Sequence, residues 1–410
     1  MQLVAYGAQD VYLTGEPQIT FFKVVYRRHT NFAIECIEQS FAGSVGLGNQ
    51  VSSTISRNGD LVAGMHLQVL MPVLQAVGND LSGVNQYMSG VGHAIIETCE
   101  VEIGGQKIDK HYSEWLDIWD ELTGTAAKQS GYGEMVAKSY IAAAVNTPIG
   151  SGFVGGTDAD DYMYIPLQFW FNRNPGLALP LIALQYHEVK ILIKFRANTD
   201  LVVDISGAGT YIVAGQSGTA SGFECKLFVD YIYLDTEERR RFAQMSHEYL
   251  IDQLQFTGSE SVASGGSNSI RLNFNHPVKE LVWVYRATTN ETHNDYLNFY
   301  ADTNSITDPM TKAKIMLNGH DRAAERPATY YRLQQPWAHH TRIPQKPVYC
   351  YSFALRPEEH QPSGTCNFSR IDNATLKVKN NTITGSIYVF AVNYNVLRVV
   401  SGMGGLAYSN

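Results

Sequence analysis

The sequence predicts an all-β protein that consists of two β-sandwiches, one after the other along the chain. Three observations lead to this prediction. Strand-like runs recur throughout, the second half repeats the order of elements of the first, and a charged connector separates the halves. The chain of 410 residues is also too long for one ordinary hydrophobic core, which makes two domains the expectation.

The first half is dominated by short runs that are rich in β-branched and aromatic residues. Clusters of Gly, Asn and Pro separate these runs, as turns separate short strands. The runs cover residues 32–41, 61–71, 95–103, 162–171, 187–195 and 223–234. Many short strands punctuated by turns indicate an all-β sandwich.

One helix is predicted among these strands, in residues 111–122. Trp115, Ile118, Trp119 and Leu122 recur there at helical spacing and share one face. Gly124 follows them and ends the helix. The next stretch, 123–161, has little periodicity and is expected to be a large surface excursion or partly disordered.

The second half repeats the plan of the first. The segment Val101-Glu-Ile-Gly-Gly105 matches Ile315-Met-Leu-Asn-Gly319. A strand and a long polar loop precede each segment, and an aromatic run that ends in a Pro-containing loop follows it. These elements lie at 61–71, 72–93 and 169–175 in the first half, and at 278–285, 287–311 and 351–357 in the second. We interpret the pattern as an internal duplication, with chance similarity between two β-rich halves as the alternative.

This plan divides the chain into four segments. Residues 1–26 follow neither a strand period nor a helix period, and are predicted to form an arm that packs along a surface. The first sandwich is expected at 27–235 and the second at 248–410. Between them, residues 236–247 form a short, charged linker that is expected to be helical.

The composition excludes several classes of function. Charged residues make up 17% of the chain, against roughly 25% in an average soluble protein. Because charges are depleted where subunits meet, this low content is consistent with a protein that contacts other subunits. The 31 basic and 39 acidic residues give a net charge of −8, which argues against direct nucleic-acid binding. No apolar run is long enough for a transmembrane helix, and we expect no signal peptide. The five scattered cysteines predict reduced thiols.

No catalytic, cofactor or metal site is predicted. His187-Glu188 and His247-Glu248 both lack the second histidine of the zinc-protease motif. The pair His339-His340 lacks the His-x-His spacing of a cupin, and adjacent residues of a strand point to opposite faces.

Four Asn-x-Ser/Thr sequons lie in the second half, at Asn290, Asn367, Asn373 and Asn380. Such sequons accept glycans in secreted proteins. Asn290 is the glycosylation candidate, because it alone lies on an evident long loop.

Several long segments carry a resemblance to a known family. They are residues 2–35, 177–188, 248–258, 362–373, 393–398 and 401–408. As strings they resemble the major capsid proteins of large icosahedral double-stranded DNA viruses, the nucleocytoplasmic large DNA viruses, and those of chlorella viruses most of all. The resemblance implies two consecutive eight-stranded antiparallel jelly rolls, a double jelly roll with short helices in its loops. It also implies a homotrimer of pseudo-hexagonal outline that tiles an icosahedral shell without catalysis.

The resemblance further implies where the chain acts and with which partners. The expected place is the outer shell of a virion that is assembled in the host cytoplasm. The expected partners are neighbouring capsomers, minor capsid proteins and inner membrane-associated proteins. The arm would face the particle interior. The excursions at 72–93, 123–161, 196–222 and 287–311 would lie outside, with 123–161 and 287–311 among those that meet the host surface.

Three alternatives stay open at this point. A glycan-binding sandwich, either a lectin or a receptor-binding spike, could use aromatic loop residues as sugar platforms; these are Tyr296, Phe299, Tyr300, Tyr330 and Tyr331. A cupin-like enzyme is disfavoured by the missing metal ligands. A minor capsid paralogue at special positions is the third, because the loop at 287–311 is trimmed relative to the family.

Overall fold

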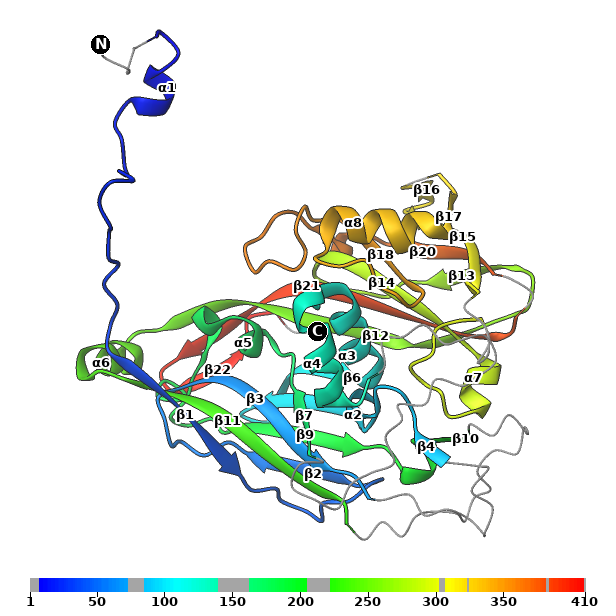
Figure 1. Cartoon of the computed structure of the whole chain (residues 1–410), viewed down its shortest axis with the longest axis horizontal. Coiled ribbons are helices and arrows are strands. Elements are labelled where there is room, and N and C mark those ends of the chain that lie inside the picture. Colours follow the sequence, from blue (N-terminus) through cyan, green and yellow to red (C-terminus); the bar gives the residue numbers. More distant parts are fainter. Residues whose placement is uncertain are drawn as a thin grey trace.

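The computed structural model describes residues 7–72, 85–138, 162–204, 222–301, 307–322, 324–380 and 383–408. They form two β-sandwiches, with an amino-terminal arm that runs away from the body (Figure 1). Within the described residues, no helix has the length and apolar character needed to cross a bilayer.

The first sandwich has two main antiparallel sheets. One sheet has the strand order β1–β11–β3–β7, with β8 paired to β3, and the other has the order β2–β9–β5–β6. A small sheet pairs β4 with β10. The strands are β1 (Phe32–Gln39), β2 (Gln50–Thr54), β3 (Leu61–Leu70), β4 (Asn85–Tyr87), β5 (Ile96–Ile103), β6 (Gln106–Tyr112), β7 (Met163–Pro166), β8 (Leu179–Pro180), β9 (Val189–Phe195), β10 (Val202–Asp204) and β11 (Glu224–Leu234).

The second sandwich repeats this arrangement. One sheet has the order β12–β21–β14–β18, with β19 and β22 at its margins, and the other has the order β13–β20–β15–β16, with β17 paired to β15. The strands are β12 (His247–Val262), β13 (Ser267–Arg271), β14 (Pro277–Ala287), β15 (Met310–Leu317), β16 (His320–Asp321), β17 (Arg326–Pro327), β18 (Val348–Ser352), β19 (Cys366–Asn367), β20 (Ala374–Asn380), β21 (Gly385–Val400) and β22 (Met403–Leu406).

The two sandwiches correspond strand for strand, which makes the fold a double jelly roll. Even local irregularities recur. The β5–β6 turn has positive φ at Gly104 and Gly105 (59° and 79°), and the β15–β16 turn has it at Asn318 and Gly319 (52° and 78°). Two-residue hairpin turns of this kind favour Gly and Asn, which adopt positive φ at low cost. The repeated geometry supports an internal duplication over chance similarity.

Short helices fill the connections. They are α1 (Val11–Thr14), α2 (Val91–Ala94), α3 (Ser113–Thr123), η1 (Ala126–Lys128), α4 (Gln129–Val136), α5 (Trp170–Arg173), η3 (Pro175–Leu177), η4 (Asn198–Asp200), α6 (Thr236–Gln244), α7 (Thr288–Thr292), η5 (Tyr330–Gln334), α8 (Gln335–His339) and η6 (Phe368–Arg370). Two expectations are corrected here. The strand predicted at 162–171 ends at Pro166 and gives way to α5, and the start of the 123–161 excursion forms η1 and α4. Residues 139–161 lie outside the described part.

Each sandwich has its own apolar core, built from the inward-facing residues of alternating strands. In β3, Met65, Leu67 and Val69 point into the first core, so His66 and Gln68 point outward. In β14, Leu281, Trp283 and Tyr285 point into the second core. The outward residues Val282 and Val284 belong to a third cluster, which joins the two sandwiches.

Candidate assembly surfaces

Helix α3 lies between the two sandwiches and holds them together (Figure 1). Its residues Trp115, Ile118, Trp119 and Leu122 pack on the outer face of the β12–β21–β14–β18 sheet. Trp115 lies with its ring centroid 5.6 Å from that of Phe390. The predicted helix and its apolar face are therefore confirmed. The partner of that face is the other half of the chain.

The remaining sides of α3 carry acidic groups that meet a cluster of buried cations. Lys138, fully buried, places its Nζ 2.7 Å from Asp117, 2.7 Å from Asp120 and 2.8 Å from Glu121. Two residues of the second sandwich complete the cluster. Lys346 lies 2.7 Å from Asp117, and Arg342 lies 3.0 Å from Glu121. We call these six residues the inter-sandwich ion cluster.

Electrostatics within this cluster favour the ionised form of Asp117. Burial alone would raise the pKa of Asp117, but Lys138 and Lys346 lie so close that its pKa is held well below the usual range. The oxygens of Asp117, Asp120 and Glu121 converge closely enough to hold a metal ion. The ammonium group of Lys138 already binds them, so the arrangement is an ion cluster within the protein fold.

A second convergence of metal-ligand types lies on the outer face of the first sandwich. Cys36, His66 and Asp230 offer ligand atoms within 4.8 Å of one another. Burial, and then the neighbouring Asp230 carboxylate, raise the pKa of the Cys36 thiol to about 11. At neutral pH the thiol is therefore protonated and donates a hydrogen bond to Asp230. His66 stacks on Phe228, with ring centroids 5.4 Å apart.

The His339-His340 pair is split by the fold. The imidazole of His340 is fully buried and lies 2.9 Å from both Glu280 and Glu358. His339 instead bonds the backbone oxygen of Leu355 at 3.0 Å. The two rings thus serve different partners. No local pattern predicts that His340 pairs with carboxylates, since Glu280 lies 60 positions earlier in an apolar strand.

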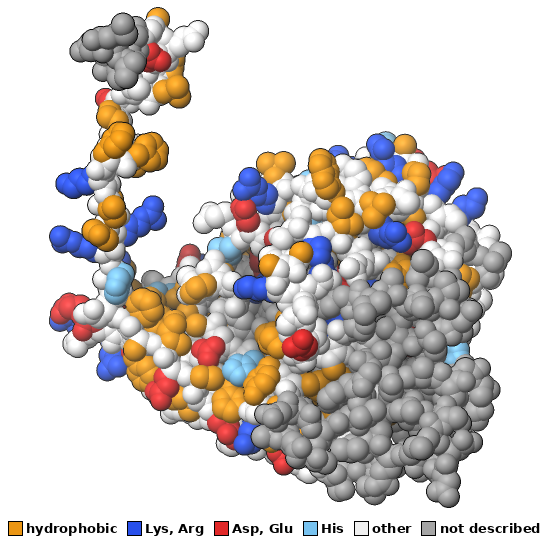
Figure 2. Space-filling model, viewed as in Figure 1, with side chains coloured by type: hydrophobic (Ala, Val, Ile, Leu, Met, Phe, Trp, Pro, Cys, Tyr) orange, Lys and Arg blue, Asp and Glu red, His pale blue; other side chains and the backbone are white. Residues whose placement is uncertain are grey.

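The amino-terminal arm exposes many large apolar side chains. Every residue from 11 to 31 is exposed. Large hydrophobic side chains recur along it (Figure 2). They are Val11, Tyr12, Leu13, Ile19, Phe21, Phe22, Val24, Val25 and Tyr26. Exposed apolar side chains in such number mark an interaction site.

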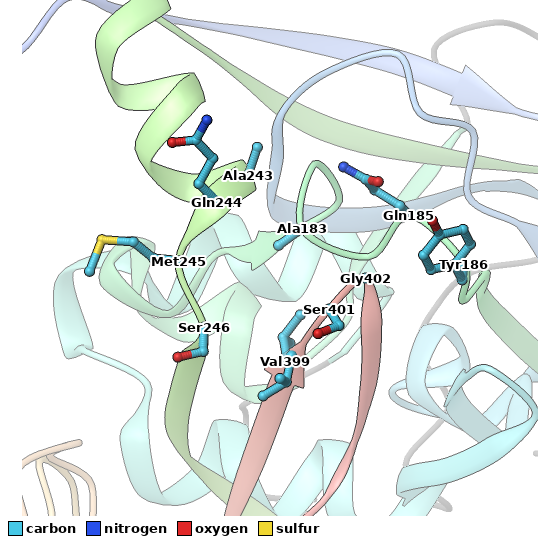
Figure 3. Close-up of a pocket in the computed structure, with 11 residues that line it drawn as sticks. Ala183, Gln185, Tyr186, Ala243, Gln244, Met245, Ser246, Val399, Ser401 and Gly402 are labelled. Atoms are coloured by element: carbon cyan, nitrogen blue, oxygen red, sulfur yellow. The ribbon is translucent and has the colours of Figure 1, made fainter.

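A pocket of about 500 Å³ lies near the root of the arm. It is formed by the end of α6, the loop at 183–186 and the turn between β21 and β22 (Figure 3). Tyr186, Met245 and Val400 line it with exposed apolar side chains. Because Phe32 pairs with Leu234 immediately before α6, the arm and the pocket occupy the same end of the molecule.

The glycosylation candidate Asn290 is corrected by its burial. It lies in α7, is fully buried, and donates its side-chain amide to the backbone oxygens of Asn298 and Tyr300 at 3.1 and 2.9 Å. A glycan needs this same nitrogen to be free and exposed. The folded chain therefore does not present Asn290 as an acceptor, whereas the sequons at Asn367 and Asn373 are exposed.

The proposed sugar platforms are also largely buried. Phe299 and Tyr331 are fully buried, and Tyr300 is nearly so. Tyr296 lies beneath the guanidinium group of Arg196, 4.4 Å from the ring centroid. The described part of the polar loop at 287–311 nevertheless supplies core, because Phe299 packs against α3. Residues 302–306 lie outside the described part, as do portions of the excursions at 72–93 and 196–222.

Comparison with protein families agrees with this architecture. Residues 20–235 match the family model described as the major capsid protein N-terminus. Residues 238–405 match that of the large eukaryotic DNA virus major capsid protein. The chain is 52% identical to the major capsid protein of Pyramimonas orientalis virus, over 100% of this chain and 99% of that protein. It is 44% identical to that of Paramecium bursaria Chlorella virus 1, with the same coverage.

Solved structures lead to the same group. VP54 of PBCV-1 superposes with a TM-score of 0.79 at 39% identity, over 95% of this chain and all of that one. The Faustovirus major capsid protein superposes with a TM-score of 0.72 over 96% of this chain and 94% of that one. At 14% identity that likeness shows the shared fold alone. With both halves matched by family models and relatives aligned from end to end, the chain belongs to the major capsid protein family of the large eukaryotic DNA viruses.

Proposed function

We propose that this chain is the structural building block of an icosahedral virion shell, and that three copies form a pseudo-hexagonal capsomer. The observation that carries the proposal is the pair of strand-for-strand equivalent sandwiches held side by side by α3. Three such chains provide six similar modules, which satisfy hexagonal packing without six separate subunits. The segments 27–235 and 248–410 act as the two modules, with 236–247 as the linker between them.

The oligomeric state is the first expected result. The purified chain should sediment at about three times its mass of 45.6 kDa, and each subunit should bury on the order of several thousand Å², as obligate interfaces do. Sedimentation velocity or mass photometry measures the mass directly. A stable monomer at micromolar concentration would contradict the proposal.

We propose that the arm and the neighbouring pocket face the particle interior. There the arm contacts neighbouring capsomers, minor capsid proteins or inner membrane-associated proteins. The support is its set of exposed apolar side chains, which no described contact with the two sandwiches covers.

Deletion of residues 1–26 should leave both sandwiches folded, because the cores contain no residue of the arm. Shell assembly should be impaired. Circular dichroism and thermal unfolding test the fold, and electron microscopy of assembled particles tests the shell. Failure of the truncated chain to fold would place the arm in a core instead.

We place the outer excursions, including 123–161 and 287–311, on the exterior, where host-surface contact would occur after assembly in the host cytoplasm. The buried aromatic residues of the described loops remove support from a lectin or spike function. The copy number of this chain in purified particles distinguishes a major capsid protein from a minor paralogue at special positions.

A further inference from the structure

The connection that joins the two sandwiches has an equivalent in the second sandwich. Helix α3 lies in the connection from β6 to β7 and covers the outer face of the β12–β21–β14–β18 sheet. The matching connection of the second sandwich, from β17 to β18, contains η5 and α8. We call residues Tyr330–His339 the distal helix. It lies on the side of the second sandwich away from the first (Figure 1).

The two surfaces that would complete the repeat both carry exposed apolar side chains, although Phe242 of α6 covers Ile232 at one end of the β1–β11–β3–β7 sheet. On the distal helix, Trp337 is 73% exposed and Leu333 is also exposed. They are four residues apart, as Trp115 and Trp119 are in α3, so they share one helical face. On the β1–β11–β3–β7 sheet, which corresponds to the covered sheet of the second sandwich, Ile34 is 59% exposed and Tyr164 is exposed. Figure 2 shows hydrophobic side chains gathered over these strands.

We infer that the distal helix of one copy packs on the outer face of the β1–β11–β3–β7 sheet of another copy, repeating the contact of α3 with the second sandwich. The inference rests on the proposed trimer and names its contact surfaces. One patch meets a different patch in this contact, so it is heterologous, and such contacts close into a ring when the rotation between copies permits. Three copies that alternate internal and intermolecular contacts form a closed ring of six modules.

Strand register identifies the matching positions. His66 lies opposite Phe228, and Val282 lies opposite Phe390. Both sheets have a one-residue register shift between these strands, and the two pairs lie at the same distance from it. Phe228 therefore corresponds to Phe390, which contacts Trp115 in the internal interface. The stacked rings of His66 and Phe228 offer a flat surface on which an indole can pack. Trp337 is the indole that the distal helix supplies.

At a second set of equivalent positions, charged residues of the internal contact are replaced by apolar residues. In the internal contact, Asp252 lies 3.6 Å from Arg173 and 3.0 Å from Lys279. By register, Asp252 corresponds to Ile34, since their partners are Tyr394 and Ile232. Lys279 and its counterpart Ala63 are the residues skipped where the two registers shift.

On the other side of this contact, a charged residue is likewise replaced by an apolar one. Arg173 stands two residues before Pro175, and the residue two before Pro357 is Leu355. Leu355 is 73% exposed. Charged groups therefore face each other inside the chain, while apolar residues occupy both matching surfaces between chains. A charge on one surface alone would be buried without a partner, which is costly. Because both surfaces have apolar residues where the internal contact has charges, we infer that the two surfaces meet.

The test is a set of surface variants studied by sedimentation velocity over a range of concentrations. Trp337→Glu and Leu355→Arg should each raise the concentration needed for trimer formation at least 100-fold. Circular dichroism should be unchanged, since both side chains are exposed in the single chain. Tyr186→Glu is the matched control. Tyr186 is 76% exposed but lies at the pocket near the root of the arm, so this variant should still form the trimer.

A compensating variant makes the test specific. Ile34→Asp alone should also weaken the trimer, and Ile34→Asp with Leu355→Arg should restore it to within 10-fold of the wild type by recreating the Asp252–Arg173 pair between chains. If the wild-type chain is not a trimer, the proposed function fails. If the wild type is a trimer but Trp337→Glu and Leu355→Arg leave it intact, the trimer stands and this contact is wrong. Loss without rescue in the double variant overturns the pairing of Ile34 with Leu355.

Discussion

Replacement of Lys138 by methionine is expected to lower the free energy of unfolding by about 3–5 kcal/mol, the cost typical of breaking a buried ion pair from one side. Lys138 binds three carboxylates of α3 at 2.7–2.8 Å. Lys346 and Arg342 still pair with Asp117 and Glu121 in the variant, but Asp120 loses its ion pair with the Lys138 ammonium group, 2.7 Å away. The damage falls on the helix that joins the two sandwiches.

Urea unfolding at pH 7 and one fixed protein concentration measures this loss, because the stability of an oligomer depends on concentration. Lys312→Met is the matched control. Lys312 pairs with Glu325 at 3.4 Å, and both side chains are half exposed, so its loss should cost less than about 1 kcal/mol. Equal small effects for the two variants would show that the inter-sandwich ion cluster does not stabilise the fold.

His340→Gln is expected to remove a pH-dependent part of the stability of the second sandwich. Burial opposes the charged imidazole, but Glu280, and then hydrogen bonds that include one to Glu358, raise the pKa of His340 well above its ordinary value of 6.5. A group whose pKa is raised by folding stabilises the protein fully below its unfolded pKa, and this contribution is lost as the pH rises through the folded pKa. The wild type should therefore lose stability in alkaline solution.

The variant should be less stable than the wild type by about 3–5 kcal/mol at pH 6, because Glu280 stays buried without a cation. The difference should shrink as the pH rises toward and beyond the raised pKa. Unfolding free energies at pH 6 and at a series of alkaline values test this, with the exposed His320→Gln as control. A constant difference at every pH would mean that His340 acts through packing alone.

Some elements were predictable because local sequence determines them. The helical face of Trp115 and Trp119 depends only on spacing, and the Gly104-Gly105 turn depends only on which residues accept positive φ. The strands at 61–71 and 187–195 follow from alternation of apolar residues. The strand prediction failed where two signals compete. Aromatic residues at 169–171 favour a strand, yet the chain begins the short helix α5 there, after β7 ends.

The assembly surfaces depended on contacts that no local pattern encodes. Lys138 meets Asp117 across a gap of 21 residues, and His340 meets Glu280 across 60, without a spacing that predicts either pair. Asn290 and Phe299 lie in a polar stretch that composition assigns to the surface, but the fold buries both: Asn290 bonds the backbone of its own loop, and Phe299 packs with α3.

The sequence by itself determined the class of fold, the duplicated order of elements and the family. These depend on residue type, period and similarity along the chain. Only the tertiary structure decided which faces meet: that α3 covers the second sandwich, and that the distal helix and the β1–β11–β3–β7 sheet keep exposed apolar side chains. Side-chain periodicity specifies that a face is apolar, but the partner of that face is set by the path of the whole chain through space.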